Sequence, residues 1–257
     1  MMLKKFGAIL VLAAFGLAGS CAFAASTLDK DVLTVGTEAT YPPFEYYNED
    51  NVITGFDVEL LALIGPKIGR EISWVDMAYD GLIPALTTGK IDMAAAAINA
   101  TEERRKVVDF SDVYQVADAS VVVKAGNKDS LRGLAGLKGR AIGVQLGTTE
   151  DAYLTNSELG VDIRRYQKVD DAVNEVALGR IDGVLLDSPV AISYVGNEKF
   201  KGSIEISFRE LINAPEEGFA LAVRKGDAAF VEALNKALRE LQDSGELDAL
   251  KEKYGLK

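Results

Sequence analysis

The sequence predicts an α/β protein of two lobes, each a mainly parallel sheet with flanking helices, with the second lobe inserted into the first. Strand-like and helix-like segments alternate from Asp29 to the end of the chain. Two landmarks also occur twice in the same order. A strand runs into Gly-Thr at 36–37 and at 147–148, and a helix ends in Gly, a base and Ile-Asp at 89–92 and at 179–182. The repeated order indicates two related lobes, although glycine before a charge is also a common helix end.

The elements of the first lobe follow from local patterns. Residues 32–36 predict a strand, and residues 56–68 predict a helix whose first turn carries two acids. Pro66 should kink or split that helix, because proline lacks an N–H and collides with the preceding turn. A short helix is expected over 81–88 and a buried strand over 91–98, after which Thr101 is the expected N-cap of the next helix.

The lobe boundaries follow from where this pattern is interrupted. We expect the first lobe to comprise residues 29–116 and 219–257, and the second lobe to comprise residues 120–212. The chain would then cross between the lobes twice, near 116–120 and near 212–219. Two crossings give a hinge that bends without letting the lobes drift apart. The C-terminal part predicts a strand over 219–223, a helix over 228–242 capped by Asp227, and a last helix ending near Tyr254.

The first 24 residues are typical of a signal peptide. Lys4 and Lys5 precede an apolar run over 6–18, and Ala22-Phe23-Ala24 is a small-x-small cleavage signal. This pattern predicts export to the periplasm. Residues 17–21 also resemble a lipobox, so lipid anchoring through Cys21 remains as an alternative to release of a soluble protein.

The charge of the chain restricts its partners. The 257 residues hold 28 Lys and Arg, 39 Asp and Glu, and no histidine. Without the two lysines of the signal peptide the net charge is 26 − 39 = −13. Such an acidic chain argues against nucleic acid and against anionic membrane surfaces as partners. No spacing typical of a metal site occurs, and we expect no metal and no cofactor.

Polar and aromatic residues follow several predicted strands, where open α/β sheets bind ligands. Arg104 can hold a carboxylate bidentately, and the N–H groups of Thr148 and Thr149 can add a second anion site from a helix N-terminus. Asp187 can accept hydrogen bonds from an ammonium group. Together these groups suit the two charged ends of a free amino acid, and groups drawn from both lobes would make closure depend on the ligand.

Each of these assignments has an alternative. Arg104 lies in a charged run that is typical of a solvated helix face. Thr148 and Thr149 can be ordinary helix caps, Asp187 can be a turn residue before Ser-Pro, and Asn99 can cap the following helix. Only the joint placement of these residues at strand ends favours a binding site.

In these stretches the chain resembles the bacterial extracellular solute-binding proteins for polar amino acids, the receptors of ABC importers. The likeness runs from about Leu33 to Tyr254. It rests on six stretches in the family's order: Thr40-Tyr41-Pro42-Pro43-Phe44, Gly55-Phe56-Asp57-Val58-Glu59-Leu60, Asp80-Gly81-Leu82-Ile83-Pro84-Ala85-Leu86, Val108-Asp109-Phe110-Ser111-Asp112, Gln145-Leu146-Gly147-Thr148-Thr149 and Leu238-Arg239-Glu240-Leu241. The resemblance implies the Venus flytrap fold of periplasmic binding proteins, a free amino acid as ligand, a membrane permease as partner and a monomeric protein.

The resemblance also implies roles for single residues. Arg104, helped by Thr149, would bind the α-carboxylate, and Asp187 would bind the α-ammonium. The predicted ligand-binding residues are Glu38, Tyr41, Tyr79, Ala97, Asn99, Arg104, Gln145, Thr148, Thr149 and Asp187. Ala96 and Ala97 stand where relatives often carry Ser or Gly, so side-chain hydroxyl contacts would be lost there and backbone contacts could remain.

The ligand is predicted to be basic or amide-bearing, with arginine or lysine ahead of glutamine. Glu38 beside Tyr41 and Tyr79 would suit a guanidinium or ammonium group over an aromatic face. Two other functions remain open: an enzyme on the same fold, of the cyclohexadienyl or arogenate dehydratase kind, and a soluble sensory domain. The absence of histidine and of a Gly-x-Ser-x-Gly elbow favours binding over catalysis.

Overall fold

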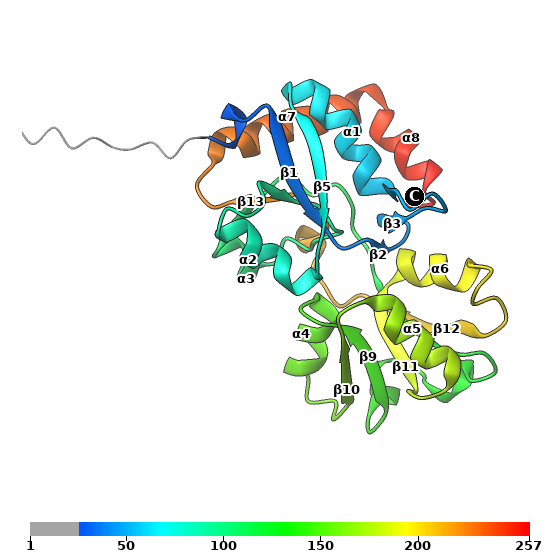
Figure 1. The fold of residues 1–257 in the computed structure, drawn as a ribbon. Coiled ribbons are helices and arrows are strands. Elements are labelled where there is room, and N and C mark those ends of the chain that lie inside the picture. Colours follow the sequence, from blue (N-terminus) through cyan, green and yellow to red (C-terminus); the bar gives the residue numbers. More distant parts are fainter. Residues whose placement is uncertain (1–25) are drawn as a thin grey trace, which may run out of the picture.

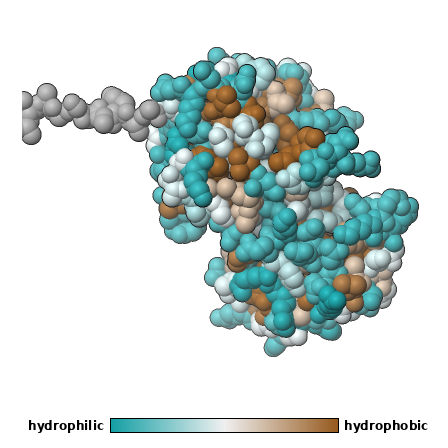
Figure 2. Space-filling view, viewed as in Figure 1, coloured by the Kyte–Doolittle hydropathy of each residue, from teal (hydrophilic) through white to brown (hydrophobic). Residues whose placement is uncertain are grey.

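The computed structural model describes residues 26–257, and the predicted signal peptide with Cys21 lies outside that range. Figure 1 shows two lobes, one carrying α1, α7 and α8 and the other carrying α4, α5 and α6, with the chain passing between them. In Figure 2 the lobes meet at a narrower waist, and hydrophilic side chains cover most of the visible face of the second lobe. Between residues 26 and 257 there is no helix with both the length and the apolar character needed to span a membrane.

The first lobe is built on a five-stranded sheet in the order β5-β1-β6-β13-β7. Four of its strands run in one direction, and β13 is antiparallel to both of its neighbours. The strands are β1 (Val32–Thr37), β5 (Glu71–Asp76), β6 (Met93–Ala94), β7 (Val108–Phe110) and β13 (Ala222–Arg224). A small sheet of β2 (Thr40–Tyr41), β3 (Glu45–Tyr47) and β4 (Ile53–Thr54) follows β1.

The second lobe repeats this plan with a sheet in the order β10-β9-β11-β8-β12. Here β8 is antiparallel to its neighbours β11 and β12, while β10, β9 and β11 pair in parallel. The strands are β8 (Ala119–Lys124), β9 (Ala141–Gln145), β10 (Asp162–Tyr166), β11 (Gly183–Asp187) and β12 (Ile204–Glu210). In both lobes the reversed strand is the first one after a crossing, β8 on entry and β13 on return.

Helices cover both faces of each sheet. The first lobe has α1 (Phe56–Ile68), α2 (Leu82–Thr87), α3 (Glu102–Arg105), α7 (Ala228–Ser244) and α8 (Glu246–Lys253). The second lobe has α4 (Thr149–Asn156), α5 (Val169–Leu178) and α6 (Ser188–Gly196). Alternation along β8 shows the two-sided packing, because Val122 faces the cluster with α5 and α6 whereas Val121 and Val123 face the cluster with Leu154 of α4.

The strand predicted over 91–98 is much shorter than expected. All residues of that run are buried, but only Met93 and Ala94 pair in the sheet. The backbone leaves the sheet at the following alanines, and Ala97 has φ 45°, in the left-handed region. Asp57 of α1 holds this conformation, because its Oδ2 accepts a hydrogen bond of 2.9 Å from the N–H of Ala97.

Pro66 does not split α1, which was one of the two expected outcomes. The helix continues to Ile68, because Pro66 lies in its last turn and removes only one hydrogen bond there. Gly69, with φ 67°, ends the helix, and its N–H donates to the carbonyl oxygens of Gly65 and Pro66.

The two crossing segments are hydrogen-bonded to each other. The N–H of Phe219 donates to the carbonyl of Gln115 at 2.7 Å, and the N–H of Tyr114 donates to the carbonyl of Phe219 at 2.9 Å. A Cβ on Gly218 would lie 2.5 Å from the Gln115 carbonyl oxygen, so only glycine permits this approach. The segments that join the lobes therefore form one paired strap.

Candidate functional site

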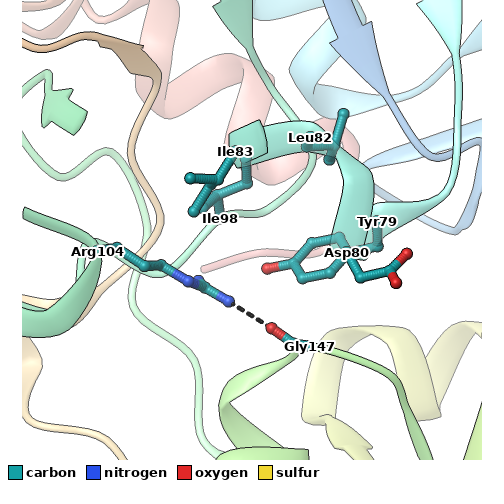
Figure 3. Close-up of a pocket in the computed structure, with 7 residues that line it drawn as sticks. All are labelled: Tyr79, Asp80, Leu82, Ile83, Ile98, Arg104 and Gly147. Carbon is teal, nitrogen blue, oxygen red and sulfur yellow. Dashed lines mark hydrogen bonds between the residues drawn. The ribbon is translucent and has the colours of Figure 1, made fainter. Parts of the chain in front are cut away.

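Arg104 reaches from the first lobe to the second. The side chain of Thr101 caps α3 by accepting from the N–H of Arg104 at 3.2 Å, as predicted. The guanidinium donates 2.9 Å hydrogen bonds to the carbonyl oxygens of Asn99 and Gly147, and it lies 5.6 Å from the centre of the Tyr79 ring. Figure 3 shows this reach across the gap to Gly147. The charge is thus directed between the lobes and not along a solvated helix face.

Asp187 ends β11 and stands at the N-cap position of α6, yet its carboxyl caps nothing there. Its Oδ2 accepts a 2.6 Å hydrogen bond from the hydroxyl of Tyr41 in the other lobe, and its Oδ1 is buried without a partner. Burial and the nearby Glu150 raise the pKa of Asp187 well above its ordinary value, while Arg104 opposes the rise. The carboxyl is therefore aimed at the interface, with one free acceptor.

Glu38 follows β1 and is only 2% exposed. Its Oε2 accepts a 2.9 Å hydrogen bond from the amide of Gln145, which ends β9 in the second lobe, and its carboxyl also accepts from the hydroxyl of Thr40. Burial raises the pKa of Glu38, and the bonds from Thr40 and Gln145 partly offset that effect. The structure therefore brings Glu38 and Gln145 together across the interface.

Thr148 and Thr149 make different hydrogen bonds. Thr148 is the N-cap of α4 and accepts from the N–H of Asp151 at 3.3 Å. Thr149 donates its hydroxyl to Asn99 Oδ1 at 3.3 Å, so this pair again joins the lobes. Asn99 does not cap a helix, because its amide donates to the carbonyl of Glu217 in the returning strap. Ala97 is buried and its N–H donates to Asp57 Oδ2, so its contact with a ligand stays a prediction.

Glu150 is the functional candidate that sequence reasoning missed. It lies in the first turn of α4, is 2% exposed and has an unpartnered Oε1. Its charge raises the pKa of Tyr41, Tyr79 and Asp187, so its carboxyl lies near these predicted site residues. The sequence feature that could have identified Glu150 is its position directly after Gly-Thr-Thr. Acids are also common in first helical turns, so this position alone does not indicate a binding role.

Two further groups at the interface were not predicted. Gly147, with φ 82°, would place a Cβ 3.1 Å from the Cβ of Asp80, so the lobes approach closely here. The hydroxyl of Tyr194 on α6 donates to the carbonyl of Thr40 at 2.8 Å. Both groups belong to the contact between the lobes, which a reading of one strand end at a time does not reveal.

Seven of the ten predicted residues thus take part in hydrogen bonds between the lobes: Arg104, Tyr41, Asp187, Glu38, Gln145, Asn99 and Thr149. The guanidinium of Arg104 and the carboxyl of Asp187 interact electrostatically across the gap between the lobes. A cavity of about 100 Å³ lies beside the guanidinium, lined by Tyr79, Asp80, Leu82, Ile83, Ile98, Arg104 and Gly147 (Figure 3). Such an arrangement can bind a small molecule that carries an anionic group and a cationic group.

Comparison with known proteins identifies the family of this chain. The family described as bacterial extracellular solute-binding proteins, family 3, matches residues 33–257. The L-cystine-binding protein TcyJ of Escherichia coli is 34% identical and covers 88% of this chain and 83% of its own length. The ABC transporter arginine-binding protein 1 of Escherichia coli is 33% identical over 95% of this chain and 98% of its own.

A solved structure is similar over almost its whole length. An ancestral arginine-binding protein bound to arginine superposes with a TM-score of 0.82 at 39% identity, and the match covers 88% of this chain and 98% of that one. The two-lobed fold, the match over nearly all described residues and the curated relatives lead to one conclusion: the chain belongs to family 3 of the bacterial extracellular solute-binding proteins.

Proposed function

We propose that this protein binds a free basic amino acid between its lobes, with arginine preferred, and presents it to the membrane permease of an ABC importer. The observation that carries this proposal is the balance of charge in the gap. Arg104 is opposed by three buried carboxyls, those of Glu38, Glu150 and Asp187. A zwitterion with a cationic side chain offsets part of this excess of negative charge, whereas an acidic ligand would increase the negative charge.

Each charged end of arginine has a partner in this arrangement. The α-carboxylate would replace the Gly147 carbonyl on the guanidinium of Arg104, and the hydroxyl of Thr149 would assist. The α-ammonium would take the free Oδ1 of Asp187. The guanidinium of the ligand would reach Glu38, and the ring of Tyr79 would flank its stem.

The names of the relatives support an amino acid ligand and leave its identity to experiment. Two of the similar proteins are named for arginine and one for L-cystine. One of them is named as part of an ABC transporter, which supports delivery to a permease. Cystine carries no net charge on its side chain, so it is the informative competitor in a binding test.

Calorimetric titration of the exported protein with the twenty amino acids and L-cystine tests the proposal. Arginine should bind most tightly, lysine next, and aspartate and glutamate should give no heat of binding. Tightest binding of an acidic, aliphatic or cystine ligand would refute the preference. Loss of arginine uptake in cells that lack the gene would support delivery to a permease, and unchanged uptake would count against it.

A variant at the predicted side-chain pocket sharpens the test. Glu38→Gln keeps the shape and removes the charge, and loss of one partner of a buried ion pair costs about 3–5 kcal/mol. Arginine affinity should therefore fall by a factor of roughly 10² or more, while glutamine affinity should change far less. Glu49→Gln is the matched control, because Glu49 is an exposed acid of the same lobe.

A further inference from the structure

The carboxyls of Glu150 and Asp187 form a buried pair within the second lobe. Glu150 is 2% exposed and Asp187 is 3% exposed, and their carboxyls lie within hydrogen-bonding reach of each other. Glu150 follows β9, and Asp187 ends β11, which pairs with β9 in the sheet. Because both acids belong to the same lobe, their pairing does not require the lobes to close.

The pair has few other partners. The hydroxyl of Thr149 lies 3.2 Å from Glu150 Oε2 and 3.3 Å from Asn99 Oδ1 and has one proton for the two acceptors, and Tyr41 donates to Asp187 Oδ2 at 2.6 Å. The remaining oxygens, Glu150 Oε1 and Asp187 Oδ1, are buried and make no hydrogen bond with the described residues. Each acid thus presents one unused acceptor in the gap.

The charges around the pair do not neutralise it. The titratable and charged groups that act on these two acids, directly or through Glu45, are Tyr41, Tyr79, Arg104, Glu38, Glu45 and Asp57. Among them only Arg104 is a cation, and its guanidinium is already engaged with two carbonyl oxygens. Two adjacent buried carboxyls cannot both ionise readily beside one shared cation.

We propose that Glu150 and Asp187 share one proton when the gap holds no ligand, and that the α-ammonium of a bound amino acid displaces this proton and binds between the two carboxylates. The inference rests on the proposed function only in requiring a free amino acid in the gap. It does not depend on the ligand's side chain, because every free amino acid except proline carries a primary α-ammonium.

The exchange balances in protons and charge. The carboxyl O–H bond breaks, the proton passes to solvent, and N–H groups of the ammonium donate to the two freed oxygens. Burial raises the pKa of both acids in the unliganded protein, and the ammonium lowers it in the complex. Binding therefore releases a proton at any pH where the free pair is protonated, and there affinity falls about tenfold for each pH unit of acidification.

Titration calorimetry in buffers of different ionisation enthalpy measures the number of protons released. The protein is titrated with arginine, or with whichever amino acid binds, from about pH 8 to about pH 5. The wild type should release about one proton at the acidic end of the series, and log Ka should fall there with a slope near one. Glu150→Gln should release none and should show a flat profile, because its amide can donate to Asp187 without a titratable proton.

Two further variants make the result specific. Glu150→Asp keeps the acid and should retain proton release, whereas Glu158→Gln, an exposed acid just after α4, should behave as the wild type. A wild type that releases no proton overturns the inference whatever the variants do. A slope that survives in Glu150→Gln also overturns it, because the proton would then belong to Asp187 alone or to another buried acid such as Glu38 or Glu45.

The same experiment separates this inference from the proposed ligand. If arginine fails to bind and another amino acid binds with release of a proton that Glu150→Gln abolishes, the preference for arginine is wrong and the carboxyl pair stands. If arginine binds without proton release, the ligand stands and the pair fails. If no amino acid binds, both fail.

Discussion

Asp57 offers the sharpest test of how the fold shapes the binding gap. The residue is fully buried at the start of α1. Its carboxylate accepts from the N–H of Ala97 at 2.9 Å and from the hydroxyl of Tyr114 at 2.7 and 2.8 Å. The carboxyl of Glu45 lies against it and has a buried Oε2 without a partner. We compare Asp57→Ala with Asp57→Asn.

Asp57→Ala should destabilise the protein strongly. The change leaves two buried donors, the N–H of Ala97 and the hydroxyl of Tyr114, without their acceptor, and each orphaned group costs about 1–3 kcal/mol. The free energy of unfolding should fall by about 2–6 kcal/mol in total, which lowers the melting temperature by about 2–4 °C for each kcal/mol. Ala97 should also relax from its left-handed conformation, which weakens ligand binding.

Asp57→Asn should cost less and should change the pH dependence. Its amide oxygen can still accept, and its N–H groups can donate to the free Oε2 of Glu45. In the wild type, burial raises the pKa of Asp57 from 3.8 to about 6. The native state then binds more protons than the unfolded state between these values, so stability falls as pH rises, by about 3 kcal/mol at most.

The pH effect appears in the difference between Asp57→Asn and the wild type. As pH rises from about 4 to above about 6, the variant should gain stability relative to the wild type, by up to about 3 kcal/mol. Urea unfolding followed by circular dichroism at several pH values measures this difference, with Asp50→Asn as an exposed control. A cost below about 1 kcal/mol for Asp57→Ala, or a difference that does not vary with pH, would refute the reasoning.

Three other predictions follow from the interface. Arg104→Gln should weaken arginine binding by a factor of roughly 10² or more, since the proposed ion pair between its guanidinium and the ligand's α-carboxylate would be lost. Arg105→Gln should stay near wild type in the same titration, because Arg105 lies over Phe110. Gly147→Ala should weaken binding, because its Cβ would lie 3.1 Å from the Cβ of Asp80, and it should also lower the melting temperature by a few degrees, because alanine is strained at φ 82°. Incubation with prephenate or arogenate should give no turnover in a chromatographic assay, and any product above the Arg104→Gln background would contradict the binding function.

The sequence by itself determined the architecture well. Hydrophobic patterns and turn residues are local, so the helix over 56–68 and the cap at Thr101 were predicted with correct bounds. The repeated strand and glycine landmarks indicated two lobes, and the structure has two sheets with the same plan. The prediction of a strand over 91–98 was wrong beyond Ala94, because the hydrogen bond from the N–H of Ala97 to Asp57 overrides the local preference for a strand.

The candidate site was likewise predictable from the sequence only in part. The sequence could name Arg104, Asp187, Glu38 and Gln145, since strand ends and motif positions are readable one segment at a time. Only the tertiary structure decided which groups meet: Tyr41 with Asp187, Gln145 with Glu38, and the unforeseen Glu150 with Asp187. The physical reason is that burial and neighbouring charge set the protonation and hydrogen bonding of an acid, and both depend on residues far apart in the chain.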